Sequence, residues 1–181
     1  MAETKPTVEY RDIQGHPGYR AGSDGSIWSC RRRGSGRAPR LTGTWRQMTA
    51  VSQTTGYLAV LLSPSRRHHL VHTLVLLAFV GPRPAGMQCC HRDGDRTNNR
   101  LENLRWGTWR DNYADQIRHG TDGRGERNPR AKLTEADVRH IRSQYAAGGV
   151  TQKQLAAQHG VTQSVISHAI TGRKWSHVEE H

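Results

Sequence analysis

Residues 89–115 concentrate side chains that could perform chemistry. Histidine, aspartate and asparagine recur there, at His91, Asp93, Asp95, Asn98, Asn99, Asn103, Asn112 and Asp115. A histidine titrates near neutral pH and can serve as a base, while carboxylate and amide oxygens suit a hard divalent ion. A base and a metal ion together can activate water for attack on an ester bond. The span therefore predicts a metal-assisted hydrolytic centre.

The elements that must position these side chains can be read from turn and cap residues. Residues 93–95 (DGD) and 97–99 (TNN) are turn formers, so they predict a loop after a short strand at residues 87–91. A second short strand returns, and Thr108 is placed as the N-cap of a helix that reaches Arg118. The predicted unit is strand, loop, strand and helix. A unit this small usually needs a metal or a neighbouring element for stability.

Residues 71–115 resemble the ββα-metal core of HNH endonucleases, in the form whose last motif residue is asparagine. His91, Asn103 and Asn112 fall at the three motif positions, and VHTLVLLAF and NNRLENLRWGT also match. The resemblance implies hydrolysis of phosphodiester bonds in double-stranded DNA with a divalent metal ion, Mg²⁺ or Mn²⁺. It implies that His91 is the general base, that Asn103 ties down the loop and orients His91, and that Asn112 ligates the metal.

Cys90 departs from the family pattern. The residue before the motif histidine often supplies a carboxylate or amide ligand in this family. A thiolate is a soft ligand, so Cys90 as a metal ligand would favour Zn²⁺ over Mg²⁺. The alternative is that Cys90 simply packs under the strand.

Charge and composition indicate the partner. Lys+Arg number 27 against 15 Asp+Glu, a net charge of +12, and most of the positive charge is arginine, which grips phosphate oxygens. We expect a polyanion partner; the alternative is an arginine-rich coding background without a nucleic-acid role. No apolar run reaches the roughly 20 residues of a membrane helix, no signal region is visible, and three cysteines make no disulfide framework. A cytoplasmic protein without a membrane partner is expected, in the host cytoplasm if the gene is phage-borne.

Residues 8–62 predict short strands separated by turns, with Asp24-Gly25 as a hairpin signal. This part resembles the small β-rich module beside the nuclease core of phage and intron-encoded HNH enzymes. Matching positions are Tyr10, Asp12, Ile13, Gly15, Gly18, Tyr19, Ser23 and Gly25. Arginines here and in the polar loop are predicted DNA contacts, with a solvated loop as the alternative: Arg31, Arg32, Arg33, Arg37, Arg92 and Arg96.

Residues 71–79 are apolar on every side and predict a buried helix with one basic group, His72. His72 could be a second catalytic histidine. We expect instead a structural histidine that is bonded to backbone, as histidines on apolar helices usually are.

The C-terminal part predicts a helix-turn-helix. Thr134, Thr151 and Thr162 are placed as caps of three short helices, with Gly160 at the turn. This part resembles the DNA-binding tails of such HNH enzymes, although three helices could also serve dimerisation or packing. The recognition helix would present polar side chains to DNA: Thr162, Gln163, Ser164, Ser167 and His168.

The sequence thus predicts an α+β protein in four parts. These are a β-rich DNA-contacting module at 1–66, an HNH core at 67–118, a linker at 119–130 and a helix-turn-helix module at 131–181. The expected function is a site-specific homing endonuclease, acting as a monomer or as a dimer assembled on DNA. The alternatives are a packaging-associated HNH nuclease of low specificity and a non-catalytic DNA-binding regulator.

Overall fold

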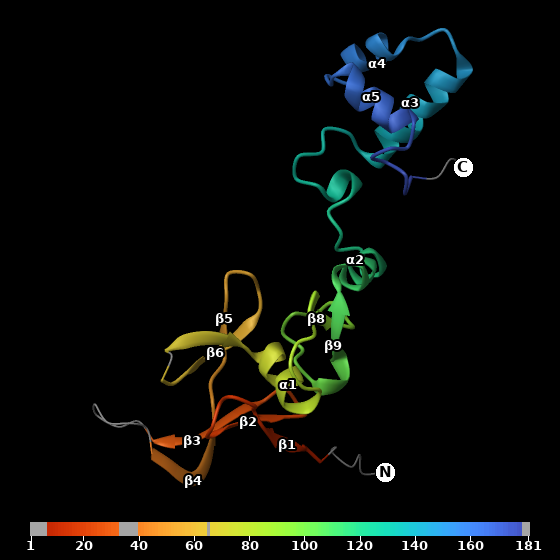
Figure 1. Cartoon of the computed structure of the whole chain (residues 1–181). Helices are drawn as coiled ribbons and strands as arrows, with labels where there is room; N and C mark the ends of the chain where they lie inside the picture. Colours follow the sequence, from red (N-terminus) through yellow and green to blue (C-terminus); the bar gives the residue numbers. More distant parts are fainter. Residues whose placement is uncertain (1–6, 33–39, 65, 179–181) are drawn as a thin grey trace, which may run out of the picture. The chain divides into compact units, whose positions relative to one another are not determined.

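The computed structural model describes residues 7–32, 40–64 and 66–178. The chain divides into two compact units, Met1–Gly120 and Thr121–His181, each with its own hydrophobic core. Helices and antiparallel sheets are both present, so the predicted α+β class is confirmed (Figure 1). Within the described ranges, every helix is too short or too polar to cross a membrane.

The first unit begins with a four-stranded antiparallel sheet in the order β1-β2-β3-β4. Its strands are β1 (Tyr10–Asp12), β2 (Tyr19–Gly22), β3 (Ile27–Arg32) and β4 (Arg40–Gln47). The predicted hairpin at Asp24-Gly25 is confirmed, because β2 and β3 pair across this turn. The Asp24 carboxylate closes the turn by accepting hydrogen bonds from the Ser26 amide at 3.0 Å and the Ser26 hydroxyl at 2.6 Å. Gly25 has φ +88°, a conformation that glycine adopts without strain.

A second sheet and a helix follow. The sheet has three antiparallel strands in sequence order: β5 (Val51–Ser52), β6 (Leu58–Leu62) and β7 (Arg67–Leu70). The predicted apolar helix is confirmed as α1 (Val71–Phe79). It starts directly after β7, so its first turn lies beside the end of that sheet.

The predicted strand, loop, strand and helix are also present. They are β8 (Met87–His91), β9 (Leu104–Thr108) and α2 (Trp109–Arg118), with a 3-10 turn at Leu101–Asn103. Strand register places Cys90 opposite Arg105 and His91 opposite Leu104. Thr108 caps α2 in a reciprocal capping box with Asp111, as the sequence predicted. This cap fixes where α2 leaves the hairpin.

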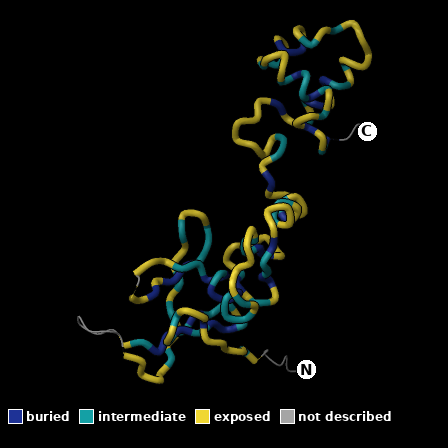
Figure 2. The backbone as a smooth tube through the Cα atoms, viewed as in Figure 1, coloured by how far each residue is buried: buried dark blue, intermediate teal, exposed yellow. Residues whose placement is uncertain are grey.

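A single core holds the first unit together. The buried stretches of this unit, dark blue in Figure 2, come mainly from β2, β3, β6 and α1. Ala21, Val60 and Leu76 are no more than 1% exposed and belong to the same cluster as Leu104 of β9. The expected boundary at residue 66 therefore does not separate two cores. A division into DNA-contacting and cutting modules remains a prediction about function.

The second unit begins earlier than the predicted helix-turn-helix. Asp122, in the expected linker, is 1% exposed and forms ion pairs with Arg124 and Arg127. A buried carboxylate is retained only where cations and donors surround it, so residues 121–127 have a fixed structure within the second unit. The sequence pattern of breakers and charges gave no sign of this burial.

Three helices complete the second unit: α3 (Glu135–Ala147), α4 (Gln152–Gln158) and α5 (Gln163–Ile170). Their buried faces meet in a core that includes Val138, Ile141, Leu155 and Ile166. Thr134 and Thr151 are the expected N-caps, and each forms a reciprocal capping box with the residue three positions later. Thr162 precedes α5 but makes no side-chain cap hydrogen bond. The predicted short helix, turn and second helix are present in α4 and α5.

Candidate active site

His91 lies at the end of β8, where its side chain turns toward α1 and the β5–β6 turn. Only 8% of the residue is exposed. The ring of His72 packs perpendicular to it with centroids 5.2 Å apart, and the ring of Tyr57 lies 6.0 Å away. His72 and Tyr57 also meet edge to face at 5.0 Å. Two aromatic neighbours therefore restrict rotation of the His91 ring.

One polar side chain reaches the His91 ring. The Nε2 atom of His91 lies 3.2 Å from Oδ1 of Asn99, a residue that is 5% exposed. Within the described parts of the chain, no group hydrogen-bonds to the other ring nitrogen, Nδ1. One nitrogen is thus held by the protein while the other is left for chemistry.

Asn103 closes the loop that follows His91. Its Nδ2 donates to Asp93 Oδ1 at 2.9 Å and to the Asn98 carbonyl at 2.8 Å, and its Oδ1 accepts from the Asp93 amide at 3.1 Å. Its own carbonyl accepts from the Arg92 amide at 2.8 Å. Burial alone would raise the pKa of Asp93, but hydrogen bonds from Asn103 and Asn98 outweigh burial and lower the pKa. Asn103 lies where the resemblance placed a loop-tying residue.

The opposite face of β8 carries Cys90, which is 1% exposed. A Cβ added at Gly107 would lie 2.9 Å from Cys90 Sγ, so the thiol packs tightly on β9. Burial raises the pKa of Cys90, with Arg105 acting in the opposite direction. The side chain is thus a protonated thiol near neutral pH, and a thiol in that state is a poor metal ligand.

Asn112 of α2 is the predicted ligand of a metal ion. Asn112 is half-buried on this helix, which packs against β8 and β9. Its amide oxygen suits Mg²⁺ or Mn²⁺, ions that usually keep several waters and take few protein ligands. Among the described residues, no group of three or more His, Cys, Asp or Glu side chains is arranged to hold an ion. The residues therefore fit a sparsely liganded, oxygen-preferring ion at Asn112 better than Zn²⁺ at Cys90.

The arginines predicted to contact DNA from the first sheet are in different situations. Arg31 donates to the Pro17 carbonyl at 2.7 Å and lies over the Tyr19 ring, so part of its guanidinium is occupied by contacts within the protein. Arg32 is exposed at the end of β3. Arg33 and Arg37 lie outside the described residues.

The two arginines of the loop between β8 and β9 differ as well. Arg92 is exposed next to His91. Arg96 is exposed too, but its Nη1 donates to the Thr55 carbonyl at 2.7 Å and its guanidinium lies 5.1 Å from the Tyr57 ring centre. Arg96 therefore joins the loop to the β5–β6 turn whether or not it also contacts DNA.

On α5 the predicted contact residues lie at the helix start and along its outer side. Thr162, Gln163 and Ser164 are exposed, whereas Ser167 and His168 are half-buried. The first three are accessible to a partner. The other two present only part of their surface.

The sequence reading missed Asn99 and Tyr57 as neighbours of His91 and misjudged His72. His72 is 5% exposed, and its Nδ1 is buried without a hydrogen-bond partner among the described residues, so the expected bond to backbone is wrong. Burial, reinforced by His91, lowers the pKa of His72 to about 4, which keeps the ring neutral. Asn99 could have been suspected only from its place in the asparagine pair that ends the loop.

A buried histidine on a hairpin strand, a loop tied by an asparagine and a following helix define the ββα class of hydrolytic core. A family model described as HNH endonuclease matches residues 69–114. Protein 7.7 of Escherichia phage T7 is 34% identical over 99 residues, which cover 54% of this chain and 72% of that protein. The chain belongs to the HNH endonuclease family.

Two further relatives carry homing endonuclease names. YosQ of Bacillus subtilis (strain 168), named as an SPbeta prophage-derived HNH homing endonuclease, is 30% identical over 113 residues, 60% of this chain and 64% of that protein. The DNA endonuclease I-HmuI of Bacillus phage SP01 is 27% identical over 117 residues, 63% of this chain and 60% of that protein. The matches thus span less than two thirds of each of these relatives.

A solved structure has a similar fold. It is that of I-HmuI, described as DNA binding and cleavage by the HNH homing endonuclease, and it aligns with a TM-score of 0.50 at 20% identity. The alignment covers 91% of this chain and 90% of that one. The similarity therefore extends beyond residues 69–114.

Proposed function

We propose that this protein is a divalent-metal-dependent DNA endonuclease of the site-specific homing type. The main support is the held His91, with Nε2 on Asn99 and Nδ1 left open, inside the segment that matches the HNH endonuclease model. The net charge of +12 suits a phosphate polyanion. The cytoplasm of the cell that carries the gene is the proposed place of action.

His91 acts as general base in this proposal. Its Nδ1 takes a proton from the attacking water, while Asn103 keeps the loop closed so that the strand end stays in place. Asn112 would hold the metal ion through its amide oxygen. When bound there, a divalent ion would stabilise negative charge on the phosphate and the departing oxygen.

The test of the function is incubation of the protein with plasmid and neighbouring genomic DNA, with Mg²⁺ or Mn²⁺ and with EDTA, followed by mapping of ends on both strands. Metal-dependent ends at one position support a homing endonuclease. Scattered ends would favour the low-specificity packaging nuclease, and binding without ends would favour the non-catalytic regulator. Because one site cuts one strand, paired breaks would also require a dimer assembled on DNA or a repositioned monomer.

Cys90→Asp is expected to lower the Mg²⁺ concentration that gives half-maximal cleavage by about tenfold, since groups around a metal site commonly change affinity by 10–100-fold. The substitution places an anionic oxygen on the face of β8 that packs on α2 and leaves a hard ligand where a protonated thiol stood. Metal titration of cleavage measures the effect.

Cys90→Ala is the matched control, since it removes the sulfur without adding a ligand. A protonated, uncoordinated thiol predicts an unchanged Mg²⁺ requirement for this variant. Thermal melts report whether the buried carboxylate unfolds the protein. A folded Cys90→Asp protein with an equal or higher Mg²⁺ requirement would show that residue 90 is not part of the metal site.

Arg32→Ala is expected to weaken binding to all DNA sequences and to reduce the salt slope of log Kd by up to about 0.9, the value for one lost phosphate contact on duplex DNA. Arg32 is exposed and leaves the sheet at the end of β3. Arg139→Ala is a control, because that guanidinium already pairs with Glu135 at 3.3 Å. An unchanged salt slope for Arg32→Ala would show that Arg32 is a solvated surface residue without a phosphate contact.

A further inference from the structure

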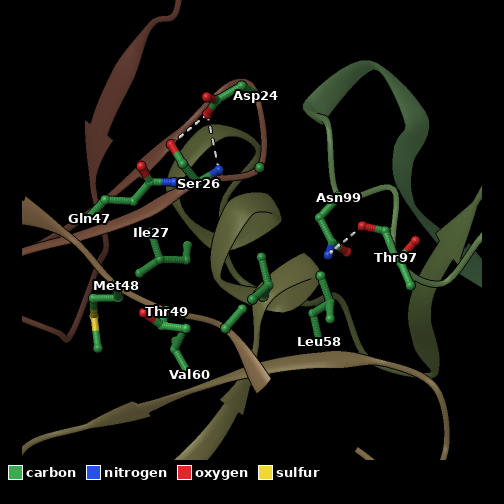
Figure 3. A pocket seen from close by; sticks show the side chains of 13 residues that line it. Asp24, Ser26, Ile27, Gln47, Met48, Thr49, Leu58, Val60, Thr97 and Asn99 are labelled. Carbon is green, nitrogen blue, oxygen red and sulfur yellow. Dashed lines mark hydrogen bonds between the residues drawn. The ribbon is translucent and has the colours of Figure 1, made fainter. Parts of the chain in front are cut away.

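The orientation of the Asn99 side-chain amide is set by its hydrogen bond to the Thr97 carbonyl. Its Nδ2 donates to the Thr97 carbonyl at 3.2 Å, the dashed line between these two residues in Figure 3. Its Oδ1 lies 3.2 Å from Nε2 of His91. Thr97 is held in turn, because its amide and hydroxyl donate to Asp95 Oδ1 at 2.8 and 2.7 Å. The Thr97 contact selects this orientation, because a flipped amide would set an oxygen against the Thr97 carbonyl with no hydrogen between them.

This orientation determines which nitrogen of His91 carries the proton. A carbonyl oxygen only accepts hydrogen bonds, so the 3.2 Å contact requires a hydrogen on Nε2. In a neutral imidazole the other nitrogen, Nδ1, is then the unprotonated acceptor. The perpendicular ring of His72 and the nearby ring of Tyr57 oppose a ring flip that would exchange the two nitrogens.

The backbone of Asn99 rests against the β2–β3 turn of the N-terminal sheet. A Cβ built on Gly25 would lie 2.7 Å from the Asn99 carbonyl oxygen and 2.8 Å from its carbon, so nothing larger than glycine fits. Beside this contact, the Leu101 amide donates to the Ser23 carbonyl at 2.9 Å. Both segments also line a cavity of about 600 Å³. Figure 3 shows Asp24 and Ser26 on one side of it and Thr97 and Asn99 on the other.

We propose that Asn99 is a positioning residue that holds His91 in the Nε2–H tautomer, and that the β2–β3 turn holds Asn99 in place through the close contact at Gly25. The inference rests on the proposed function for its catalytic meaning. It assigns the N-terminal sheet a part in preparing the base in addition to any contact with DNA. An imidazole that already has its free Nδ1 needs no proton rearrangement before it accepts the proton of water.

The tautomer can be measured without metal or DNA. In the full-length protein labelled with ¹⁵N-histidine, two-bond ¹H–¹⁵N correlations distinguish Nε2–H from Nδ1–H rings, and the spectrum of His91→Gln identifies the His91 signals. We expect Nε2–H in the wild type, a mixture of tautomers in Asn99→Ala, and Nε2–H again in Asn99→Asp, which restores an accepting oxygen. An Asn99→Ala protein that keeps pure Nε2–H would overturn the assignment.

Cleavage provides the second measurement. We expect Asn99→Ala to lower kcat by about 10–100-fold, the usual range for a residue that orients a site ligand, with KM nearly unchanged and with recovery in Asn99→Asp. A folded Asn99→Ala protein with full kcat would contradict the proposal. If the wild type cut no DNA, the proposed function would fail, while the tautomer measurement would still decide the role of Asn99.

Gly25→Ala tests the turn, and Gly15→Ala is its matched control. Both glycines have positive φ, +88° and +77°, so both substitutions strain the backbone alike. Gly15 has no atom within 4 Å of an added Cβ, whereas Gly25 has the Asn99 backbone. Mixed tautomers and reduced kcat in Gly25→Ala alone would support the coupling. Equal behaviour of the two variants would overturn the role of the turn.

Discussion

We expect replacement of His91 by alanine to reduce DNA cleavage by about 10²–10⁴-fold, the range for loss of a general base. The substitution removes the nitrogen that accepts the proton of water and leaves the exposed arginines Arg32 and Arg92 untouched. The Kd for DNA should therefore stay within a few fold of the wild type. Single-turnover cleavage with saturating Mg²⁺ and a binding titration without metal measure the two quantities.

His68→Ala is the control for this prediction, because it removes a histidine that is exposed on β7. Its cleavage rate should equal that of the wild type. His91→Ala also leaves a cavity beside His72 and Tyr57, so a thermal melt must show that the protein remains folded. Cleavage at the wild-type rate by folded His91→Ala would show that another group is the base.

The elements of the nuclease hairpin and helix could be predicted because their signals are local. Thr108 with Asp111 marks the start of α2, and Thr134 with Asp137 marks the start of α3, in each case by hydrogen bonds within one helical turn. The spacing of the motif residues along β8, β9 and α2 is local in the same sense. Such signals depend on few residues, and the surrounding fold does not alter them.

The partners of His91 could not be predicted, because they come from segments that are distant in sequence. Tyr57 belongs to the β5–β6 turn, His72 to α1, and Gly25, which holds Asn99, to the β2–β3 turn. Their meeting depends on the shared core of the first unit. The sequence shows that His72 is a polar residue on an apolar helix, but it does not show which side chains the His72 ring contacts.

The burial of Asp122 in the expected linker could not be predicted from the sequence either. Breakers and charges at residues 119–130 gave a pattern typical of a flexible connection. Asp122 is instead buried, and Arg124 supplies a hydrogen bond that lowers its pKa against the effect of burial. Whether a carboxylate is solvated or enclosed depends on the cations that the fold brings to it, and spacing alone does not reveal this.

Removal of residues 121–181 is expected to leave metal-dependent nicking and to lower site preference by about 10²-fold or more, since specific binding by DNA-reading proteins typically exceeds non-specific binding by 10³ or more. The core of the first unit is built from residues between Ile13 and Leu104, so the shortened protein should fold. The ratio of kcat/KM on the cognate site to that on a scrambled site measures the preference.

The double substitution Gln163→Ala and Ser164→Ala in the whole chain distinguishes base reading by α5 from a general contribution of positive charge by the second unit. Both side chains are exposed at the start of α5, and the core of the second unit does not use them. If α5 reads base edges, this variant loses part of the preference, because each base contact contributes about 1–3 kcal/mol of discrimination. If the second unit only adds positive charge, the double variant keeps its preference and the truncation weakens cognate and scrambled sites equally. An unchanged ratio after truncation would show that the site is chosen by the first unit, and the helix-turn-helix would then serve dimerisation or packing.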